Sequence, residues 1–211
     1  MREHIFFDLD GTLTDPREGI TGCIQHALRE LQVHVPPKDE LEWCIGPPLF
    51  QSFVALAGEE NAQAGVDHYR DRFDVSGWCE NEPYEGIHDV LQHLRESDRN
   101  LYVASSKPLV FVERILKHFA LADFFVGVYG SELDGRLSDK SELLAHALKR
   151  ENLVGSQCVM LGDRKHDAIG AANNDMDFVG VLWGYGSASE FVAAGADRVF
   201  NAVHDIRQLG G

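Results

Sequence analysis

The spacing of hydrophobic residues differs between two parts of this chain: one part has a helical spacing throughout, and in the other short apolar runs alternate with helical patterns. Between residues 16 and 83 the apolar positions recur every three or four residues, which is typical of amphipathic helices. Residues 5–7, just before this block, form a short and wholly apolar run that indicates a strand buried on both faces. After Gly86, short apolar runs alternate with helical patterns. Repeated strand–helix units of this kind predict a parallel sheet covered by helices on both faces.

The pattern and its Gly and Pro breaks give approximate bounds for each element. In the first block we expect helices at residues 20–31, 39–44, 50–56 and 61–73. In the later part we expect strands at residues 101–104, 124–129, 158–161, 178–182 and 198–200. Before and between those strands we expect helices at residues 87–95, 108–119, 140–148, 168–172 and 189–194, with Ser138 or Asp139 capping the third of these helices. The chain therefore reads as α/β: a Rossmann-like doubly wound parallel sheet (residues 1–15 and 84–211) interrupted by an all-helical insertion (residues 16–83).

Two carboxylates follow the first predicted strand directly. Asp8 and Asp10 are spaced to face the same way, and Gly11 and Thr12 continue into a turn. Two carboxylates held so close repel each other, which favours a cation between them. The backbone N–H groups and the hydroxyl of the turn could bind an anion beside that cation. An ordinary surface turn and a calcium loop are the alternatives. Leu13 and Gly19 stand where a calcium loop needs glycine and glutamate, which argues against that loop. The buried strand in front argues against both the calcium loop and the surface turn.

Other polar residues fall after later strands or at a helix start. Ser105 follows the second core strand, Lys140 begins a helix beyond the third, and Asp163 and Asp167 follow the fourth. Taken singly, Ser105 reads equally well as a helix cap and Lys140 as a solvated surface lysine. A doubly wound sheet, however, brings the carboxyl ends of its strands together along one edge. The coincidence of all four positions predicts one site at that edge.

Composition narrows the possible partners. The 211 residues are 44% hydrophobic and 25% charged, as in a globular protein, and the formal net charge of −15 disfavours nucleic acids and acidic membranes. No apolar run is long enough to span a bilayer and no signal-peptide core is found, so we expect a cytoplasmic protein. Cys23, Cys44, Cys79 and Cys158 are scattered, without a C-x-x-C pair, and are expected to be reduced and mostly buried.

The ordered set of motifs resembles the haloacid dehalogenase superfamily from residue 4 to about residue 198. Asp8-Leu9-Asp10-Gly11-Thr12-Leu13-Thr14-Asp15 is similar to its first motif, Ser105 to its second, Lys140 to its third, and Gly162-Asp163-Arg164-Lys165-His166-Asp167 to its fourth. The insertion resembles the family's helical cap. The phosphoglycolate phosphatase and 5′-nucleotidase-like branch is the most similar, through Tyr84-Glu85-Gly86-Ile87, Ser106-Lys107-Pro108, Leu133-Asp134-Gly135 and Trp183-Gly184-Tyr185-Gly186.

This resemblance implies a role for each motif residue. Asp8 would form an aspartyl-phosphate, and Asp10 would act as general acid and then general base. Mg²⁺ would be held by Asp8, by the backbone carbonyl of Asp10 and by Asp163, with Asp167 orienting the metal directly or through water. The expected phosphate-binding residues are Gly11, Thr12, Ser105, Ser106 and Lys140. Lys107 would add positive potential, or would be an ordinary surface charge.

Related chemistries fit less well. A haloacid dehalogenase lacks the second aspartate of the first motif, so Asp10 counts against it. A phosphonatase would need a cap lysine, yet Lys38, beside a Pro-Pro loop, is the only lysine between Pro16 and Pro83. A phosphomutase shares the aspartyl-phosphate but is a poorer match to the branch.

We therefore expect a Mg²⁺-dependent phosphomonoesterase acting on a small phosphorylated metabolite, and among these we favour a nucleoside 5′-monophosphate. Phosphoglycolate and a sugar phosphate are the alternative substrates, and a non-catalytic phosphate-binding or interaction protein is the alternative of another class. The cap would exclude water and select the leaving group. Its candidate substrate contacts are Arg17, Glu18, Ile45, Gly46, Pro47 and Pro48, which otherwise read as a solvated helix start and a turn.

Overall fold

The computed structural model describes residues 3–196 and 198–211, which form two compact units. The first unit comprises the chain up to Thr14 together with Pro83–Gly211, and we call it the sheet unit. The second comprises Asp15–Glu82, and we call it the helical unit. Two short strands, β2 (Thr14–Asp15) and β3 (Glu82–Pro83), pair where the chain leaves the sheet unit and returns to it.

Six parallel strands form the sheet, in the order β5-β4-β1-β6-β7-β8. Their bounds are β1 His4–Phe7, β4 Asn100–Pro108, β5 Gly127–Ser131, β6 Cys158–Gly162, β7 Asp177–Val181 and β8 Val199–Phe200. β1 lies between β4 and β6, and Ile5, Phe6 and Phe7 are fully buried. The wholly apolar run therefore marked a strand covered on both faces, as predicted.

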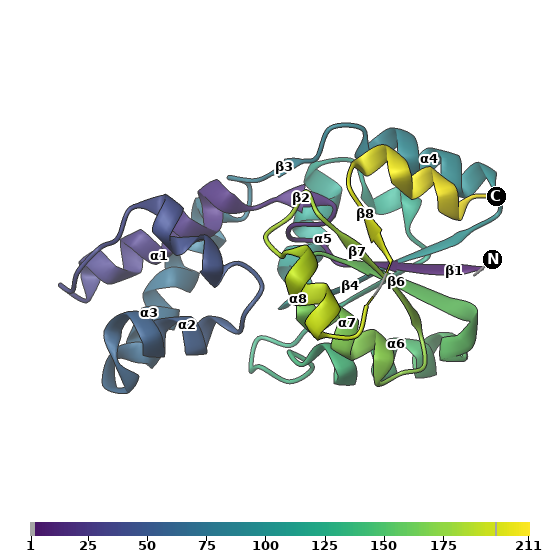
Figure 1. Ribbon diagram of the computed structural model, residues 1–211. Coiled ribbons are helices and arrows are strands. Elements are labelled where there is room, and N and C mark those ends of the chain that lie inside the picture. The colour runs from purple at the N-terminus through teal and green to yellow at the C-terminus, as the bar shows by residue number, and fades with distance from the viewer. Residues whose placement is uncertain (1–2, 197) are drawn as a thin grey trace. The chain divides into compact units, whose positions relative to one another are not determined.

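Helices cover both faces of the sheet (Figure 1). On one face lie α4 (Ile87–Glu96) and the 3₁₀ segment η5 (Val203–Leu209), which pack together; on the other lie α6 (Lys140–Glu151) and α7 (Lys165–Ala172). α5 (Leu109–His118) packs on β4 and β5, and α8 (Ala188–Ala193) follows β7. Phe6 stacks on Tyr102 at a centroid distance of 4.6 Å in the core beneath α6. This is the Rossmann-like doubly wound sheet that the pattern predicted.

The expected strand at residues 124–129 was wrong at its start. Residues Ala122–Phe124 form a 3₁₀ turn, and β5 begins at Gly127. The rings of Phe124 and Phe125 pack on other elements although neither residue belongs to a strand: Phe125 lies edge-on to Phe7, and Phe124 lies against His88. The hydrophobicity of Phe124 and Phe125 therefore led to a predicted strand that starts too early. The C-terminal 3₁₀ segment η5 was not predicted.

The helical unit contains α1 (Arg17–Glu30), η1 (Lys38–Cys44), α2 (Leu49–Ala57), α3 (Glu59–Arg72) and a π-helical turn, η2 (Phe73–Gly77). An aromatic cluster joins α2 to α3: Phe53 lies edge-on to Tyr69, and Tyr69 stacks on Phe73 at 5.3 Å. The segment expected as a helix at residues 39–44 is 3₁₀ instead. Pro37 precedes this segment and Gly46-Pro47-Pro48 follow it, so residues that interrupt helices bound it on both sides.

Two further predictions concern the whole chain. No helix within residues 3–196 and 198–211 has both the length and the hydrophobicity needed to cross a membrane. No disulfide joins the four cysteines, and Cys23, Cys44 and Cys158 are buried, which agrees with the expectation of mostly buried thiols.

Candidate active site

Carboxylates from two neighbouring strand ends meet at the C-terminal edge of the sheet. The ladder between β1 and β6 continues one step beyond the strands, because the Asp8 N–H donates to the Leu161 carbonyl at 2.9 Å. This bond places the loop after β1 beside the loop after β6. One oxygen each of Asp8, Asp163 and Asp167 lies within 4.8 Å of the others. The structure thus brings together three of the residues that the sequence assigned to one site.

Lys140 supplies the positive charge nearest to these carboxylates. It is the first residue of α6, whose N-cap Asp139 accepts hydrogen bonds from the N–H groups of Ser141 and Glu142. Its ammonium donates to the Ala104 carbonyl at 2.8 Å and contacts Asp167 at 2.8 Å and Asp8 at 3.1 Å. Burial alone would lower the pKa of Lys140, but Asp167 and Asp8 raise it above its ordinary value. Lys140 is therefore a buried permanent cation and not a solvated surface lysine.

Asp10 faces a second lysine. The Lys107 ammonium lies 2.8 Å from Oδ1 and 2.7 Å from Oδ2 of Asp10, and both side chains are largely buried. Burial raises the pKa of Asp10, as does Asp8, while Lys107 opposes the rise. Two carboxylates two residues apart thus have different cationic partners, Lys140 for Asp8 and Lys107 for Asp10. Such a difference in environment separates a nucleophile from an acid–base group in many active sites.

The Asp8, Asp163 and Asp167 cluster has the properties of a divalent-cation site. Burial, reinforced by Asp167 and Asp8, raises the pKa of Asp163 well above its ordinary value. Burial also raises the pKa of Asp167 to about 6, against the opposing effect of Lys140. Asp163 Oδ1 is buried and has no hydrogen-bond partner within the described residues. Hard oxygen ligands with an unsatisfied charge are the donor set that Mg²⁺ prefers, so these residues fit the metal. The Asp10 carboxylate stands outside the cluster, beside Lys107.

The turn after Asp8 differs in one respect from the expectation. The Gly11 N–H donates to the Thr14 carbonyl at 2.8 Å, and the Thr12 N–H donates to the Leu9 carbonyl at 3.3 Å. Both amides are engaged inside the turn, so in this conformation they are not available to an anion. Gly11 is required for another reason: its φ is +77°, and a Cβ there would lie 2.1 Å from Asp163 Oδ2.

The end of β4 supplies hydroxyl groups and a carbonyl. Ser105 is buried on this strand, and its hydroxyl lies 3.4 Å from the Lys107 N–H, which donates to it. Ser106 is half-buried beside it. Because Lys140 bonds to Ala104 and Lys107 bonds to Asp10, the end of β4 joins the same site as the loops after β1 and β6.

A fourth loop, not assigned a role from the sequence, also reaches the site. After β7, the Tyr185 N–H donates to Asp163 Oδ2 at 2.8 Å, and the indole N–H of Trp183 donates to the Thr12 carbonyl at 3.1 Å. Glu190 on α8 then accepts from the Lys165 N–H at 2.7 Å. The alternation of glycine and aromatic residues directly after a predicted strand was the available signal for this loop.

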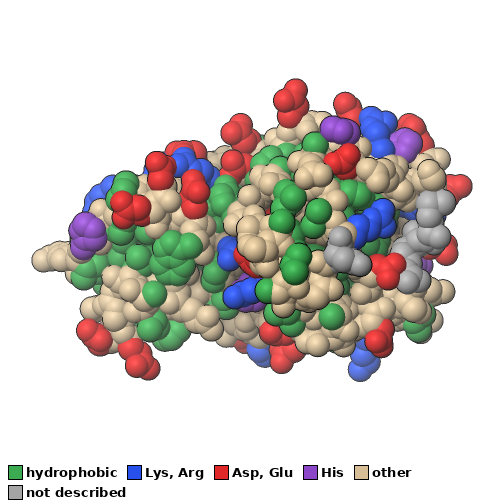
Figure 2. Space-filling view, viewed as in Figure 1, with side chains coloured by type: hydrophobic (Ala, Val, Ile, Leu, Met, Phe, Trp, Pro, Cys, Tyr) green, Lys and Arg blue, Asp and Glu red, His purple; other side chains and the backbone are tan. Residues whose placement is uncertain are grey.

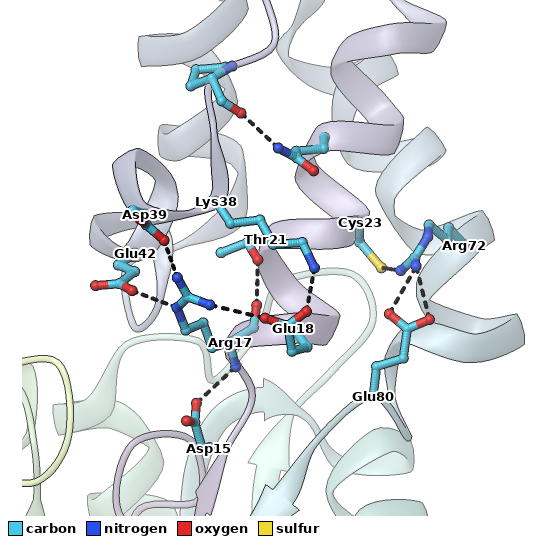
Figure 3. Close-up of polar contacts among 12 residues, drawn as sticks. Asp15, Arg17, Glu18, Thr21, Cys23, Lys38, Asp39, Glu42, Arg72 and Glu80 are labelled. Carbon is cyan, nitrogen blue, oxygen red and sulfur yellow. Dashed lines mark hydrogen bonds and ion pairs between the residues drawn. The ribbon is translucent and has the colours of Figure 1, made fainter.

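The candidate specificity residues lie in the helical unit. Figure 3 shows the Arg17 guanidinium held by three carboxylates, those of Glu18, Asp39 and Glu42. Glu18 in turn pairs with Lys38. The network joins the start of α1 to η1, so the charge of Arg17 is satisfied within the unit.

The other candidates in this unit surround a turn. Ile45 is buried, whereas Gly46 and Pro48 are exposed and Pro47 is half-buried. Gly46 has a φ of +104°, a value that favours glycine. The accessible surface of this turn is therefore formed by Gly46, Pro47 and Pro48, without Ile45.

The molecular surface is strongly acidic. Figure 2 shows Asp and Glu side chains spread over the visible face of both units, in keeping with the net charge of −15. The two lysines of the site are instead buried, each against carboxylates. An anionic ligand would be received by these local charges, because the overall field repels it.

Comparison with known proteins agrees with this chemistry. A family model described as haloacid dehalogenase-like hydrolase matches residues 5–181. A 5′-nucleotidase of Pseudomonas aeruginosa is 48% identical over 192 residues, which are 90% of this chain and 87% of that protein. The crystal structure of a predicted phosphatase from Clostridium acetobutylicum matches with a TM-score of 0.94 and 39% identity, over 99% of this chain and 98% of the other.

One relative bears a different name. Tyrosine-protein kinase PtkA of Mycobacterium tuberculosis is 39% identical over 205 residues, which are 97% of this chain and 70% of that protein. The same fold and a similar sequence thus occur in proteins named for phosphate hydrolysis and for phosphate transfer.

Proposed function

Because the chain belongs to the haloacid dehalogenase-like hydrolases and is a phosphatase of that family, we propose that it hydrolyses a small phosphomonoester through an aspartyl-phosphate on Asp8. One observation carries the proposal. Three buried carboxylates and a buried lysine converge where the ends of β1 and β6 meet the start of α6. Phosphoryl transfer needs this combination, since positioning and charge stabilisation do most of its catalytic work.

Asp8 is the proposed nucleophile. Its Oδ1 accepts from the Leu9 N–H at 2.8 Å and contacts Lys140, which fixes the rotation of the carboxylate. Within the described residues Oδ2 has no such bond and is the oxygen that would attack phosphorus. Attack forms the Asp8–phosphorus bond and releases the alcohol oxygen of the substrate, and water later hydrolyses the aspartyl-phosphate.

Asp10 is the proposed general acid and base. The raised pKa of its buried carboxyl favours a bound proton, which it would give to the departing alcohol oxygen. It would then take a proton from the water that attacks the aspartyl-phosphate. Lys107 holds the carboxylate in place between these steps.

Asp8, Asp163 and Asp167 are the proposed residues of a Mg²⁺ site, with the Asp10 carbonyl as a further ligand. Bound there, the metal would neutralise charge on the transferring phosphoryl oxygens. Lys140 and the Ser105 hydroxyl would also bind those oxygens, with Ser106 adding a second hydroxyl.

The proposed substrate is a nucleoside 5′-monophosphate, supported by the 48% identity to a 5′-nucleotidase. Phosphoglycolate and sugar phosphates are the alternatives. Gly46 and Pro47 remain the proposed contacts in the helical unit, which would serve as the cap, whereas Arg17 and Glu18 would first have to leave their ion pairs. A panel of these three substrate classes compared by kcat/KM decides among them. Equal rates on all three would argue against a nucleotide-specific enzyme.

The experiment for the chemistry is hydrolysis of an aryl phosphate by Asp8→Asn with Mg²⁺ present. We expect activity to fall by at least about 10³-fold, because an amide is not a nucleophile at phosphorus. Asp134→Asn, at an exposed aspartate in the sheet unit, is the matched control and should keep full activity. Undiminished hydrolysis by Asp8→Asn would refute the assignment, and no hydrolysis by the unaltered protein would favour a phosphate-binding role.

A second candidate, phosphate transfer to tyrosine, is favoured by the 39% identity to PtkA. Incubation with γ-labelled ATP and a tyrosine-containing protein separates the two activities. Free labelled phosphate indicates hydrolysis, whereas label retained on tyrosine indicates transfer.

A further inference from the structure

The loop after β7, residues 183–186, touches both acidic loops of the site. We propose that this segment is a positioning element that sets the spacing between Asp163 and the Asp8 turn, and thereby the affinity for the divalent cation. The inference rests on the proposed function, because it concerns the Mg²⁺ site. It assigns a role to residues that do not themselves contact the reacting atoms.

The first contact fixes the Asp163 side chain. The Tyr185 N–H donates to Oδ2 at 2.8 Å, while Oδ1 has no partner within the described residues. One carboxylate oxygen is therefore anchored by the loop, and the other is left for a ligand. A side chain surrounded by two like charges would otherwise rotate away from them, so the anchor opposes that repulsion.

The second contact fixes the turn that carries Asp8 and Asp10. The indole N–H of Trp183 donates to the Thr12 carbonyl at 3.1 Å. The turn is already compact, since Leu13 and Thr14 both donate to the Leu9 carbonyl, at 2.9 and 3.0 Å. The indole thus ties a rigid turn to the same loop that anchors Asp163.

The glycines of the loop allow this close approach. A Cβ on Gly184 would lie 2.3 Å from the Gly11 carbonyl oxygen and 2.6 Å from Asp163 Oδ2. A Cβ on Gly186 would lie 1.8 Å from the Asp163 carbonyl oxygen. Backbone of the loop therefore packs directly on both acidic segments, and any side chain would push them apart.

Trp183→Phe tests the proposal, because it removes the indole N–H and keeps a ring. The readout is Mg²⁺ binding to the substrate-free protein by isothermal titration calorimetry. We expect the dissociation constant to rise by about 10-fold, as for partners that orient metal ligands elsewhere. Saturating Mg²⁺ should restore kcat for aryl phosphate hydrolysis, since the catalytic groups themselves are intact.

Two further variants complete the design. Trp43→Phe makes the same substitution at an exposed tryptophan of the helical unit and should leave Mg²⁺ binding unchanged. Gly186→Ala forces the loop away from Asp163 and should weaken Mg²⁺ binding more than Trp183→Phe does. Near-UV circular dichroism and the metal-free Tm report whether each variant is folded.

The outcomes are distinct. Weaker Mg²⁺ binding in folded Trp183→Phe and Gly186→Ala, with Trp43→Phe unchanged, supports the positioning role. Unchanged Mg²⁺ binding in folded Trp183→Phe overturns it, as does a kcat that excess Mg²⁺ fails to restore. If the unaltered protein binds no Mg²⁺, the proposed metal site itself fails, which is a separate result.

Discussion

Single residues of the site are held in states that their type does not ordinarily favour. Lys140 is buried yet charged, because Asp167, Asp8 and the Ala104 carbonyl surround its ammonium. Asp163 is buried, and one of its oxygens has no partner among residues 3–196 and 198–211, which costs free energy in the metal-free protein. Buried charges and unsatisfied polar atoms of this kind reduce stability and are common where a site is preorganised for a ligand.

Replacing Asp163 by asparagine should therefore stabilise the metal-free protein. Asn keeps an acceptor for the Tyr185 N–H and removes a charge from the cluster. We expect the Tm without metal to rise by about 2–8 °C, which corresponds to about 1–2 kcal/mol. Differential scanning calorimetry in EDTA measures the change. Asp123→Asn, at an exposed aspartate of the sheet unit, should have no such effect, and an unchanged or lower Tm for Asp163→Asn would contradict the account.

At the scale of elements, the site is built from the ends of strands and the start of a helix. α6 begins with Lys140 directly after its N-cap Asp139, so the cap that starts the helix also aims the lysine. The parallel order β4-β1-β6 then puts three polar loops side by side.

Asp139→Ala should destabilise the sheet unit by about 1 kcal/mol, because two amides of the first turn of α6 lose their acceptor. Asp139→Asn keeps a side-chain oxygen and should recover most of the loss. Urea denaturation followed by far-UV circular dichroism measures both variants. Equal stability of the alanine and asparagine variants would show that the cap contributes little.

At the scale of the whole molecule, the metal links stability to pH. Burial raises the pKa of Asp167 to about 6 from 3.8, so the folded metal-free protein binds more protons than the unfolded chain in this range. The stabilising effect of that proton is complete below about 3.8 and is lost as the pH rises through about 6. Mg²⁺ at the proposed site would bind the ionised carboxylates and compete with the same protons.

Mg²⁺ should accordingly raise the Tm much more at pH 7.5 than at pH 5. A tenfold excess of the metal over its dissociation constant adds about 1.4 kcal/mol, or about 3–6 °C, at the higher pH. Thermal shift with and without Mg²⁺ at both values measures the difference. Asp167→Asn should flatten it, and an equal shift at pH 5 and pH 7.5 in the unaltered protein would exclude the linkage.

Much of the fold followed from local pattern. The apolar run at residues 5–7 is a central strand. A strand covered on both faces has no side that contacts solvent, so all of its side chains are apolar. The strand prediction was wrong where hydrophobic side chains pack against other elements from outside a strand: Phe124 packs on α4 and Phe125 on β1. From the sequence, Arg17 was a candidate substrate contact or part of a solvated helix start. In the structure the carboxylates that neutralise it include two from η1, more than twenty residues away.

The order of motifs along the chain determined the fold class, the family resemblance and the candidate catalytic residues. Each motif follows a strand or begins the helix after one, and the carboxyl ends of parallel strands lie at one edge of the sheet. Tertiary structure alone decided which lysine faces which carboxylate, that the Gly11 and Thr12 amides are engaged within their own turn, and that residues 183–186 contact both acidic loops. These features depend on distances between residues far apart in sequence, and such distances are set by packing and not by local pattern.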